Sequence, residues 1–330
     1  MVLLTHGDPD QLDRSLDALL RQDLTADYDI LIVEDDPDPA SARMAAAWSL
    51  RNAGTRGRQR TRLRYLPNEG TTHGAGAVRN LGWQAASAPI VAFTGDHTVV
   101  ALDWLRQGLT AMGDGALSST AAPEAVFGSV ESPLPRRPTE LQRHTLARQT
   151  AQFAGCNWFC RRSILERLGG FDERFDDDHA TDTDLYFRLL EAGVRMQPAP
   201  AAKVAHPLPA GTWWSSVAQL RALSSEALLY KKHPRLYREK IRRPPDWHDL
   251  AVVATLLLAV GGLWQGHELL AVVAGGAWLV LTAMLSIRRL RETAGTPSQV
   301  TAVLLTSPLV PPLALFWRLA GALRHRVRYA

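Results

Sequence analysis

Two long apolar runs, separated by only four residues, dominate the last quarter of the chain. They cover residues 250–264 and 269–287 of 330. A helix of about 20 apolar residues can cross the ~30 Å hydrocarbon core of a bilayer. Residues 250–287 contain one charged side chain, Glu268, which lies between the two runs. The pattern therefore predicts a hydrophobic helical hairpin, and the alternative is a hairpin buried inside a soluble domain.

Basic residues flank this predicted hairpin on both outer sides. They are Lys240, Arg242 and Arg243 before it, and Arg288, Arg289 and Arg291 after it. Cytoplasmic loops carry an excess of Lys and Arg, so both ends should lie in the cytoplasm. A third apolar run, 300–323, contains three prolines. We expect it to be interfacial or re-entrant, because prolines free backbone groups in lipid. Residues 246–330 should thus form a membrane-associating tail.

The remaining composition narrows the class of protein. The formal net charge is +4, which fits work near anionic lipid or a phosphorylated ligand. Basic residues are scattered over the first 240 positions without a nucleic-acid-binding module, so we expect no nucleic-acid partner. The first apolar run, residues 1–5, is too short for a signal peptide, which favours a cytosolic domain. The two cysteines, Cys156 and Cys160, are expected to be core thiols.

Before residue 246 the chain alternates between short apolar segments and amphipathic ones. Strands are predicted at 29–34, 63–66, 89–94 and 125–130. Helices are predicted at 74–86, at 101–112 and from Asp8-Pro9, where Asp8 is the expected N-cap and Pro9 the first helical residue. This alternation predicts an α/β domain with a mostly parallel sheet covered by helices on both faces.

Acidic and polar residues follow the predicted strands at the points where these end. Glu34 and Asp35 follow one strand, Asp96 and His97 follow another, and a third acidic stretch runs over residues 172–184. In open α/β sheets, ligands bind beyond the carboxyl ends of the strands. The clusters therefore predict a site for a polar ligand, a metal ion or both.

Several segments, in this order, resemble the family 2 glycosyltransferases, which are inverting enzymes of the GT-A fold. The segments are the strand 30–36, AVRNLG at 77–82, FTGDH at 93–97, GGFDERF at 169–175 and DTDLYFRLLEAG at 182–193. The last two, at this spacing, are highly specific. The resemblance covers residues 1–235 and implies a GT-A catalytic domain over 1–245 that binds a nucleotide diphosphate sugar.

The resemblance also implies which residues contact the donor. Asp35 corresponds to the residue that contacts the nucleoside, with Glu34 as the neighbouring alternative, and Arg79 to a residue near the ribose or diphosphate. Arg221 lies where processive relatives carry a Q-x-x-R-W motif, so it is a further candidate for the diphosphate. Alternatively, Asp35 only ends a strand, and Arg79 and Arg221 are solvated helix residues.

The family's D-x-D metal motif is altered in this chain. Gly95-Asp96-His97 occupies the position, so glycine replaces the leading aspartate and histidine the last. The resemblance implies a divalent cation, Mn²⁺ or Mg²⁺, with Asp96, His97 and His206 as candidate ligands. Imidazole can ligate Mn²⁺, but fewer carboxylates should weaken Mg²⁺ most. Alternatively, His97 only caps the strand end and the metal is weak or absent.

The resemblance assigns the catalytic base to Asp182, where the family usually has Glu-Asp and this chain has Thr-Asp. In an inverting transfer this carboxylate takes the proton of the attacking acceptor hydroxyl. The alternative is structural, because Thr181 and Asp184 have the spacing of a capping box for a helix over 182–192.

Together these features predict a glycosyltransferase at the cytoplasmic face of the cell membrane. It would transfer a sugar from a nucleotide sugar to a glycan or lipid-linked acceptor, with membrane lipid as a further partner. The altered metal motif leaves one alternative, a catalytically weak or inactive membrane-anchored scaffold that binds sugar nucleotides.

Overall fold

The computed structural model describes residues 1–53, 61–113, 122–149, 155–208, 211–241, 247–293 and 295–328. The chain divides into two compact units. One comprises Met1–Pro133 and Ala147–Pro207, and the other Leu134–Leu146 and Leu208–Ala330. The predicted boundary between residues 245 and 246, together with Arg242 and Arg243, lies outside the described residues. That boundary stays a prediction.

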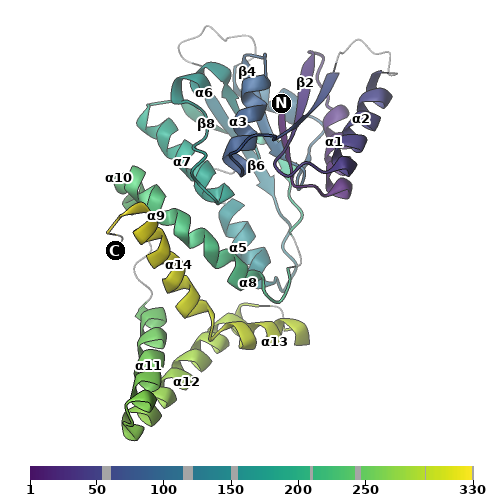
Figure 1. The fold of residues 1–330 in the computed structure, drawn as a ribbon. Helices are drawn as coiled ribbons and strands as arrows, with labels where there is room; N and C mark the ends of the chain where they lie inside the picture. The colour runs from purple at the N-terminus through teal and green to yellow at the C-terminus, as the bar shows by residue number, and fades with distance from the viewer. Residues whose placement is uncertain are drawn as a thin grey trace. The chain divides into compact units, whose positions relative to one another are not determined.

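An eight-stranded sheet in the order β3-β2-β1-β4-β7-β6-β8-β5 forms the centre of the first unit (Figure 1). Its strands are β1 (Val2–Thr5), β2 (Tyr28–Glu34), β3 (Thr61–Pro67), β4 (Ile90–Gly95), β5 (Val99–Val100), β6 (Ala125–Glu131), β7 (Trp158–Arg161) and β8 (Met196–Ala205). The four strands predicted from the sequence are all present. Neighbours β3, β2, β1 and β4 are parallel, as are β6 and β8, whereas β7 and β5 run antiparallel to their neighbours.

Helices cover both faces of this sheet. They are α1 (Pro9–Leu20), α2 (Pro39–Ala53), α3 (Ala75–Ala85), α4 (Trp104–Ala111), α6 (Arg162–Leu168) and α7 (Asp178–Glu191). Alternate strand residues pack into two separate cores. Val2 and Leu4 join α3, α6 and α7 residues in one, and Leu3 joins α1 and α4 residues in the other. This two-sided burial explains the continuous apolar runs of the predicted strands.

The predicted start of α1 is confirmed in detail. The Asp8 carboxylate accepts hydrogen bonds from the amides of Asp10 (3.0 Å) and Gln11 (3.2 Å), and Pro9 is the first helical residue. The start of α7 differs from the prediction. This helix begins at Asp178 and is capped by Asp177, whose carboxylate accepts from the Ala180 amide.

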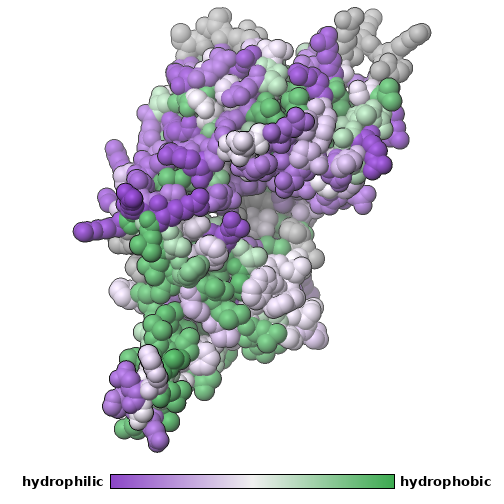
Figure 2. Space-filling model, viewed as in Figure 1, coloured by the Kyte–Doolittle hydropathy of each residue, from purple (hydrophilic) through white to green (hydrophobic). Residues whose placement is uncertain are grey.

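The second unit is helical. It contains most of α5 (Glu140–Gln149), together with α8 (Ser215–Ala218), the 3-10 helix η1 (Gln219–Ala222), α9 (Leu223–Lys232), α10 (Pro234–Lys240), α11 (Trp247–Trp264), α12 (Glu268–Arg291), α13 (Pro297–Thr306) and α14 (Val310–His325). Helices α11 and α12 pack together as the predicted hairpin, and both are long and apolar enough to cross a membrane. Most of their large apolar side chains are exposed, which argues against a buried soluble hairpin (Figure 2).

The run 300–323 forms two helices rather than one. Helices α13 and α14 meet at an angle of 55°, so as a pair they are either a broken span or a re-entrant segment. Pro308 lies at the break and Pro311 and Pro312 in the first turn of α14, where a missing amide hydrogen costs no helical hydrogen bond. The prolines thus explain the bend that the sequence predicted.

One buried arginine joins four helices of this unit. Arg289 of α12 donates to both oxygens of Glu140 on α5 (2.9 and 2.6 Å), to Ser216 on α8 and to Thr306 at the end of α13. It also donates to Ser307 at 2.8 Å. Arg289 was predicted only as a charge that flanks the hairpin. Because its guanidinium binds several partners, it also stabilises the packing of these helices.

Candidate functional site

The strand directions bring the chemically active segments to one edge of the sheet. Strands β1, β2, β4 and β8 end at this edge, so the residues that follow them, His6, Asp35, Asp96 and His206, lie there. Strand β7 is antiparallel to β4 and therefore begins at the same edge, just after Gly155. The sheet topology thus explains why residues far apart in sequence meet in one site.

Asp96 is buried at the centre of this edge. Its Oδ2 atom accepts hydrogen bonds from the Thr5 hydroxyl (2.7 Å) and the His6 amide (2.8 Å). Burial alone would raise its pKa, but the neighbouring His97 and the hydrogen bonds from His6 and Thr5 outweigh this effect and lower the pKa. Asp96 is therefore ionised. Within the described residues its Oδ1 atom is buried without a hydrogen-bond partner and faces His97 Nδ1 at 3.6 Å.

His97 folds back over Gly95. A Cβ atom added at Gly95 would lie 2.4 Å from the ring atom Cε1 of His97. The two departures from the family motif are thus sterically coupled, because the glycine makes room for the imidazole. Burial alone would lower the pKa of His97, but its interactions with Asp96 and Cys156 raise it to about 9. The imidazolium is therefore the counter-charge of Asp96 in the ligand-free protein.

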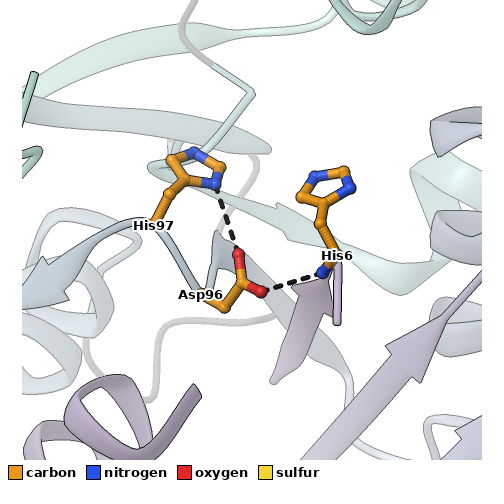
Figure 3. Close-up of side chains that lie close together, drawn as sticks. All are labelled: His6, Asp96 and His97. Atoms are coloured by element: carbon orange, nitrogen blue, oxygen red, sulfur yellow. Dashed lines mark hydrogen bonds and ion pairs between the residues drawn. The ribbon is translucent and has the colours of Figure 1, made fainter. Parts of the chain in front are cut away.

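His6, Asp96 and His97 together form a possible cation site (Figure 3). One ligand atom from each residue lies within 4.8 Å of the others. Once His97 has lost its proton, the Oδ1 atom of Asp96 and two imidazoles form a donor set that suits a transition metal better than Mg²⁺. The residues present therefore fit a divalent cation. The sequence analysis missed His6, although it directly follows a strand end as Asp35 and Asp96 do.

His206 lies beside this cluster and is not a member of it. Its ring centroid is 4.7 Å from that of His97, in an edge-to-face arrangement. Burial and the positive charge of His97 lower the pKa of His206 to about 4, so its ring is neutral. Of the three predicted metal ligands, Asp96 and His97 are thus brought together. His206 packs against the ring of His97.

A buried ion pair links the predicted base to the predicted donor residue. Arg79 Nη1 on α3 lies 3.1 Å from Asp182 Oδ1 on α7, and both side chains are nearly inaccessible. Burial raises the pKa of Asp182 to about 6, although Arg79 opposes this rise, and Asp178 and Asp177 add to it. Neither Nη1 nor Oδ1 has a hydrogen-bond partner within the described residues. Both atoms therefore have capacity to bind a ligand.

The alternative that Thr181 and Asp184 form a capping box is wrong. Because α7 starts at Asp178, Thr181 is not an N-cap, and its hydroxyl donates to the Asp177 carbonyl. Asp184 is fully buried and pairs with Arg188 at 2.8 Å, which gives it a packing role. Asp182 alone faces Arg79.

A short turn before β7 connects the base to the cation cluster. A Cβ atom added at Gly155 would lie 2.0 Å from Asp182 Oδ2, so the backbone here lies directly against the carboxylate. The next residue, Cys156, is half-buried and is one of the groups that raise the pKa of His97. The expectation of two core thiols is thus confirmed for Cys160, which is buried, and is wrong for Cys156.

Two of the family motifs, AVRNLG and GGFDERF, are joined through Asn80. Its side-chain oxygen accepts from the Phe171 amide (2.8 Å) and its side-chain nitrogen donates to the Phe171 carbonyl (2.9 Å). The neighbouring Arg79 guanidinium lies 5.5 Å from the centroid of the Phe171 ring. The AVRNLG helix and the GGFDERF turn therefore act as one structural element that orients Arg79.

Asp35 and Glu34 lie in different environments. Asp35 is partly exposed and accepts hydrogen bonds from Asn68 (2.8 Å) and from the Gly74 amide (2.6 Å) just before α3. Glu34 is buried, and its oxygens accept from Ser41, Tyr65 and the Asp38 amide. Glu34 therefore holds the β2–α2 connection, whereas Asp35 is accessible to a ligand.

Arg221 belongs to the second unit. It lies in η1, and its side chain is exposed. Its predicted contact with the donor diphosphate stays a prediction.

Comparison with known proteins identifies the family of the chain. Residues 1–169 match the family model described as glycosyl transferase family 2. Two curated relatives are pre-mycofactocin glycosyltransferases from Mycobacterium tuberculosis strains CDC 1551 / Oshkosh and H37Rv. Each is 29% identical over 142 residues, a match that covers 40% of this chain and 30% of the relative. The match thus spans less than a third of the length of those relatives.

A solved structure shares the fold. It is the mannosyltransferase PcManGT from Pyrobaculum calidifontis, in complex with GDP-Man and Mn²⁺. The likeness has a TM-score of 0.52 at 16% identity and covers 98% of this chain and 86% of that one. It supports the predicted GT-A architecture.

Proposed function

The chain belongs to glycosyl transferase family 2, and we propose that it transfers one sugar from a nucleotide diphosphate sugar to an acceptor hydroxyl with inversion. The observation that carries this proposal is the buried carboxylate of Asp182, which lies 3.1 Å from Arg79 at the ligand-binding edge of the sheet. Asp182 lies beyond the matched residues 1–169, so the proposal for this residue rests on the geometry of the site.

Asp182 is suited to act as the general base. A pKa of about 6 leaves its carboxylate mostly ionised at neutral pH and more basic than an exposed aspartate. Its Oδ1 atom can accept the hydroxyl proton as the acceptor oxygen attacks the anomeric carbon. Arg79 orients the carboxylate and stabilises its charged form, and the backbone of Gly155 lies directly against the carboxylate.

Positive charge near the cation cluster would stabilise the leaving nucleoside diphosphate. His6, Asp96 and His97 would hold a divalent cation, which when bound supplies positive charge next to the diphosphate oxygens. Arg79 would lie near the ribose or diphosphate, and Asp35, accessible at the end of β2, would contact the nucleoside. Glu34 is fully engaged in hydrogen bonds, so we assign it to positioning the β2–α2 connection.

A membrane-bound acceptor fits the second unit. Two helices are long and apolar enough to cross a bilayer, and Arg288, Arg289 and Arg291 lie in the last turn of the second. By the positive-inside tendency the hairpin starts and ends at the cytoplasmic face, where soluble nucleotide sugars are available. We therefore propose a lipid-linked or glycan acceptor at that face.

A binding screen followed by product analysis tests this function. Nucleotide diphosphate sugars should raise the melting temperature of the full chain in detergent, more with Mn²⁺ present, because a ligand of the native state stabilises it by mass action. Incubation of the best donor with membrane extracts should give a glycosylated product whose anomeric configuration, read by NMR, is opposite to that of the donor. Stabilisation without any transfer or donor hydrolysis would instead support the scaffold function.

A further inference from the structure

Helix α14 has two faces of different character. Pro311, Ala314 and Gly321 lie on its buried face. Phe316, Leu319 and Leu323, three and four residues apart, lie on one exposed face, with 54–78% of their surface accessible. An exposed stripe of large apolar side chains on a helix is typical of a segment that lies in the interface of a membrane.

The end of α14 is held against α9. Lys231 Nζ donates to the His325 carbonyl at 2.9 Å. A Cβ atom added at Gly321 would lie 2.4 Å from the Ser224 carbonyl oxygen, so the two backbones almost touch there. Because α9 has ten residues, it is too short to cross a bilayer and lies on the side from which the hairpin starts.

This attachment determines on which side of the membrane α14 ends. The hairpin α11–α12 returns to the side from which it starts, and α14 then ends beside α9 on that same side. The bent pair α13–α14 therefore does not cross the bilayer. This step rests on the membrane location proposed above.

Basic residues gather where α14 ends. Segments 223–240 and 310–328 together contain nine Lys and Arg and two Glu. The exposed ones near the contact between α9 and α14 are Lys231, Arg235, Arg238, Lys240, Arg324, Arg326 and Arg328. In Figure 2 the region of α10 and the chain end is hydrophilic, next to the hydrophobic surface of the tail. Apolar side chains beside a basic cluster match the two layers of a lipid interface, the acyl boundary and the anionic headgroups.

We propose that helices α9, α10 and α14 form a basic-apolar platform that binds the anionic headgroups of the bilayer. The stripe of Phe316, Leu319 and Leu323 inserts at the acyl boundary, and the arginines after residue 323 contact the lipid phosphates. The platform thereby adds a contact that depends on lipid charge to the anchoring supplied by the hairpin.

Lipid binding to the full chain tests this platform directly. The protein, purified in a non-ionic detergent, is titrated with phosphatidylglycerol or phosphatidylcholine, and bound lipid is counted by native mass spectrometry. The wild-type chain should prefer phosphatidylglycerol. The triple variant Arg324→Gln, Arg326→Gln, Arg328→Gln should lose this preference by roughly 10- to 100-fold, since each basic residue near the surface contributes to binding.

Two matched variants separate the local surface from net charge and from folding. Replacing Arg14, Arg21 and Arg43 with Gln removes the same charge from exposed helix positions of the first unit and should leave the preference unchanged. The charge-conserving variant Arg324→Lys, Arg326→Lys, Arg328→Lys should retain it. Equal loss in the Arg14/Arg21/Arg43 variant, or no loss in the Gln triple variant, would overturn the platform.

A competition arm distinguishes the lipid surface from a site for free phosphate. Inorganic phosphate at millimolar concentration should not displace phosphatidylglycerol selectively, whereas displacement would mean that the arginines form a phosphate pocket instead. The readout is independent of sugar transfer. A chain that binds phosphatidylglycerol but transfers no sugar would therefore contradict the proposed reaction and leave the platform intact.

Discussion

Arg79 Nη1 lies 3.1 Å from Asp182 Oδ1, and the two side chains are buried together. The pair joins α3 to α7, two helices that are separated by more than 90 residues in the chain. Burial raises the pKa of the carboxylate, and the guanidinium limits that rise, so the pair sets both the position and the basicity of the proposed base.

Asp182→Asn should retain donor binding and lose transfer by about 10²–10⁴-fold, because the amide is nearly isosteric and cannot accept a proton. Donor affinity is measured by thermal shift and transfer by initial rates. Glu191→Gln, an exposed position at the end of the same helix, is the matched control and should transfer at the wild-type rate. Transfer by Asp182→Asn at the wild-type rate would rule out this base.

The pH dependence of kcat should follow the ionisation of Asp182. Its pKa is raised to about 6, and only the ionised form accepts a proton, so kcat should be constant above this value and fall about tenfold per pH unit below it. Arg79 lowers the pKa, so Arg79→Met should move the fall to higher pH. Arg14→Met, which removes an exposed charge, should not. An unchanged acid limb in Arg79→Met would show that Arg79 does not act on the base.

Gly155→Ala should reduce kcat and stability together. The added Cβ would lie 2.0 Å from Asp182 Oδ2, so either the turn or the carboxylate must move. Overpacking of this kind costs about 1–3 kcal/mol of the free energy of unfolding. Thermal unfolding and kcat are measured on the same preparation. A variant with the wild-type melting temperature and rate would mean that the turn does not restrain the base.

Gly95 and His97 should behave as a coupled pair. Gly95→Asp alone should weaken metal-dependent donor binding, because its side chain would collide with the His97 ring. His97→Asp alone should improve use of Mg²⁺ relative to Mn²⁺, since a carboxylate is the harder ligand.

The double variant Gly95→Asp, His97→Asp removes that clash and restores two carboxylates. In the presence of Mg²⁺, the donor affinity of the double variant should therefore be higher than the value obtained by adding the effects of the two single substitutions on the binding free energy. The measurement is a double-mutant cycle of donor affinity with each ion. Additive effects of the two substitutions would contradict the coupling. Donor binding that does not depend on metal in the wild-type chain would contradict the cation site.

Arg289→Met should destabilise the second unit by about 1–3 kcal/mol, because it leaves Glu140 and several hydroxyls without their shared partner. Arg291→Met, an exposed position two residues further on, is the matched control. Unfolding in detergent is followed by circular dichroism. Equal stability of both variants would mean that Arg289 serves only as a flanking charge.

The sequence alone was sufficient for features that depend on local pattern. The continuous apolar runs indicated strands buried on both faces, Asp8-Pro9 predicted the start of α1, and the run of residues 250–287 predicted the hairpin. These predictions agree with the structure because backbone propensity and hydrophobic period are determined by residues that are neighbours in the sequence. The choice of Asp182 as the proposed base came instead from the resemblance of the motifs at 169–175 and 182–193 to those of the family.

Only the tertiary structure decided which side chains meet. Gly155 and Cys156 carry no local signal of function, and they reach the site because β1, β4 and the antiparallel β7 share one sheet edge. The same holds for Gly95, whose missing side chain matters only once the His97 ring lies over it. Contacts between distant segments depend on strand order and direction, and a local sequence pattern does not specify these.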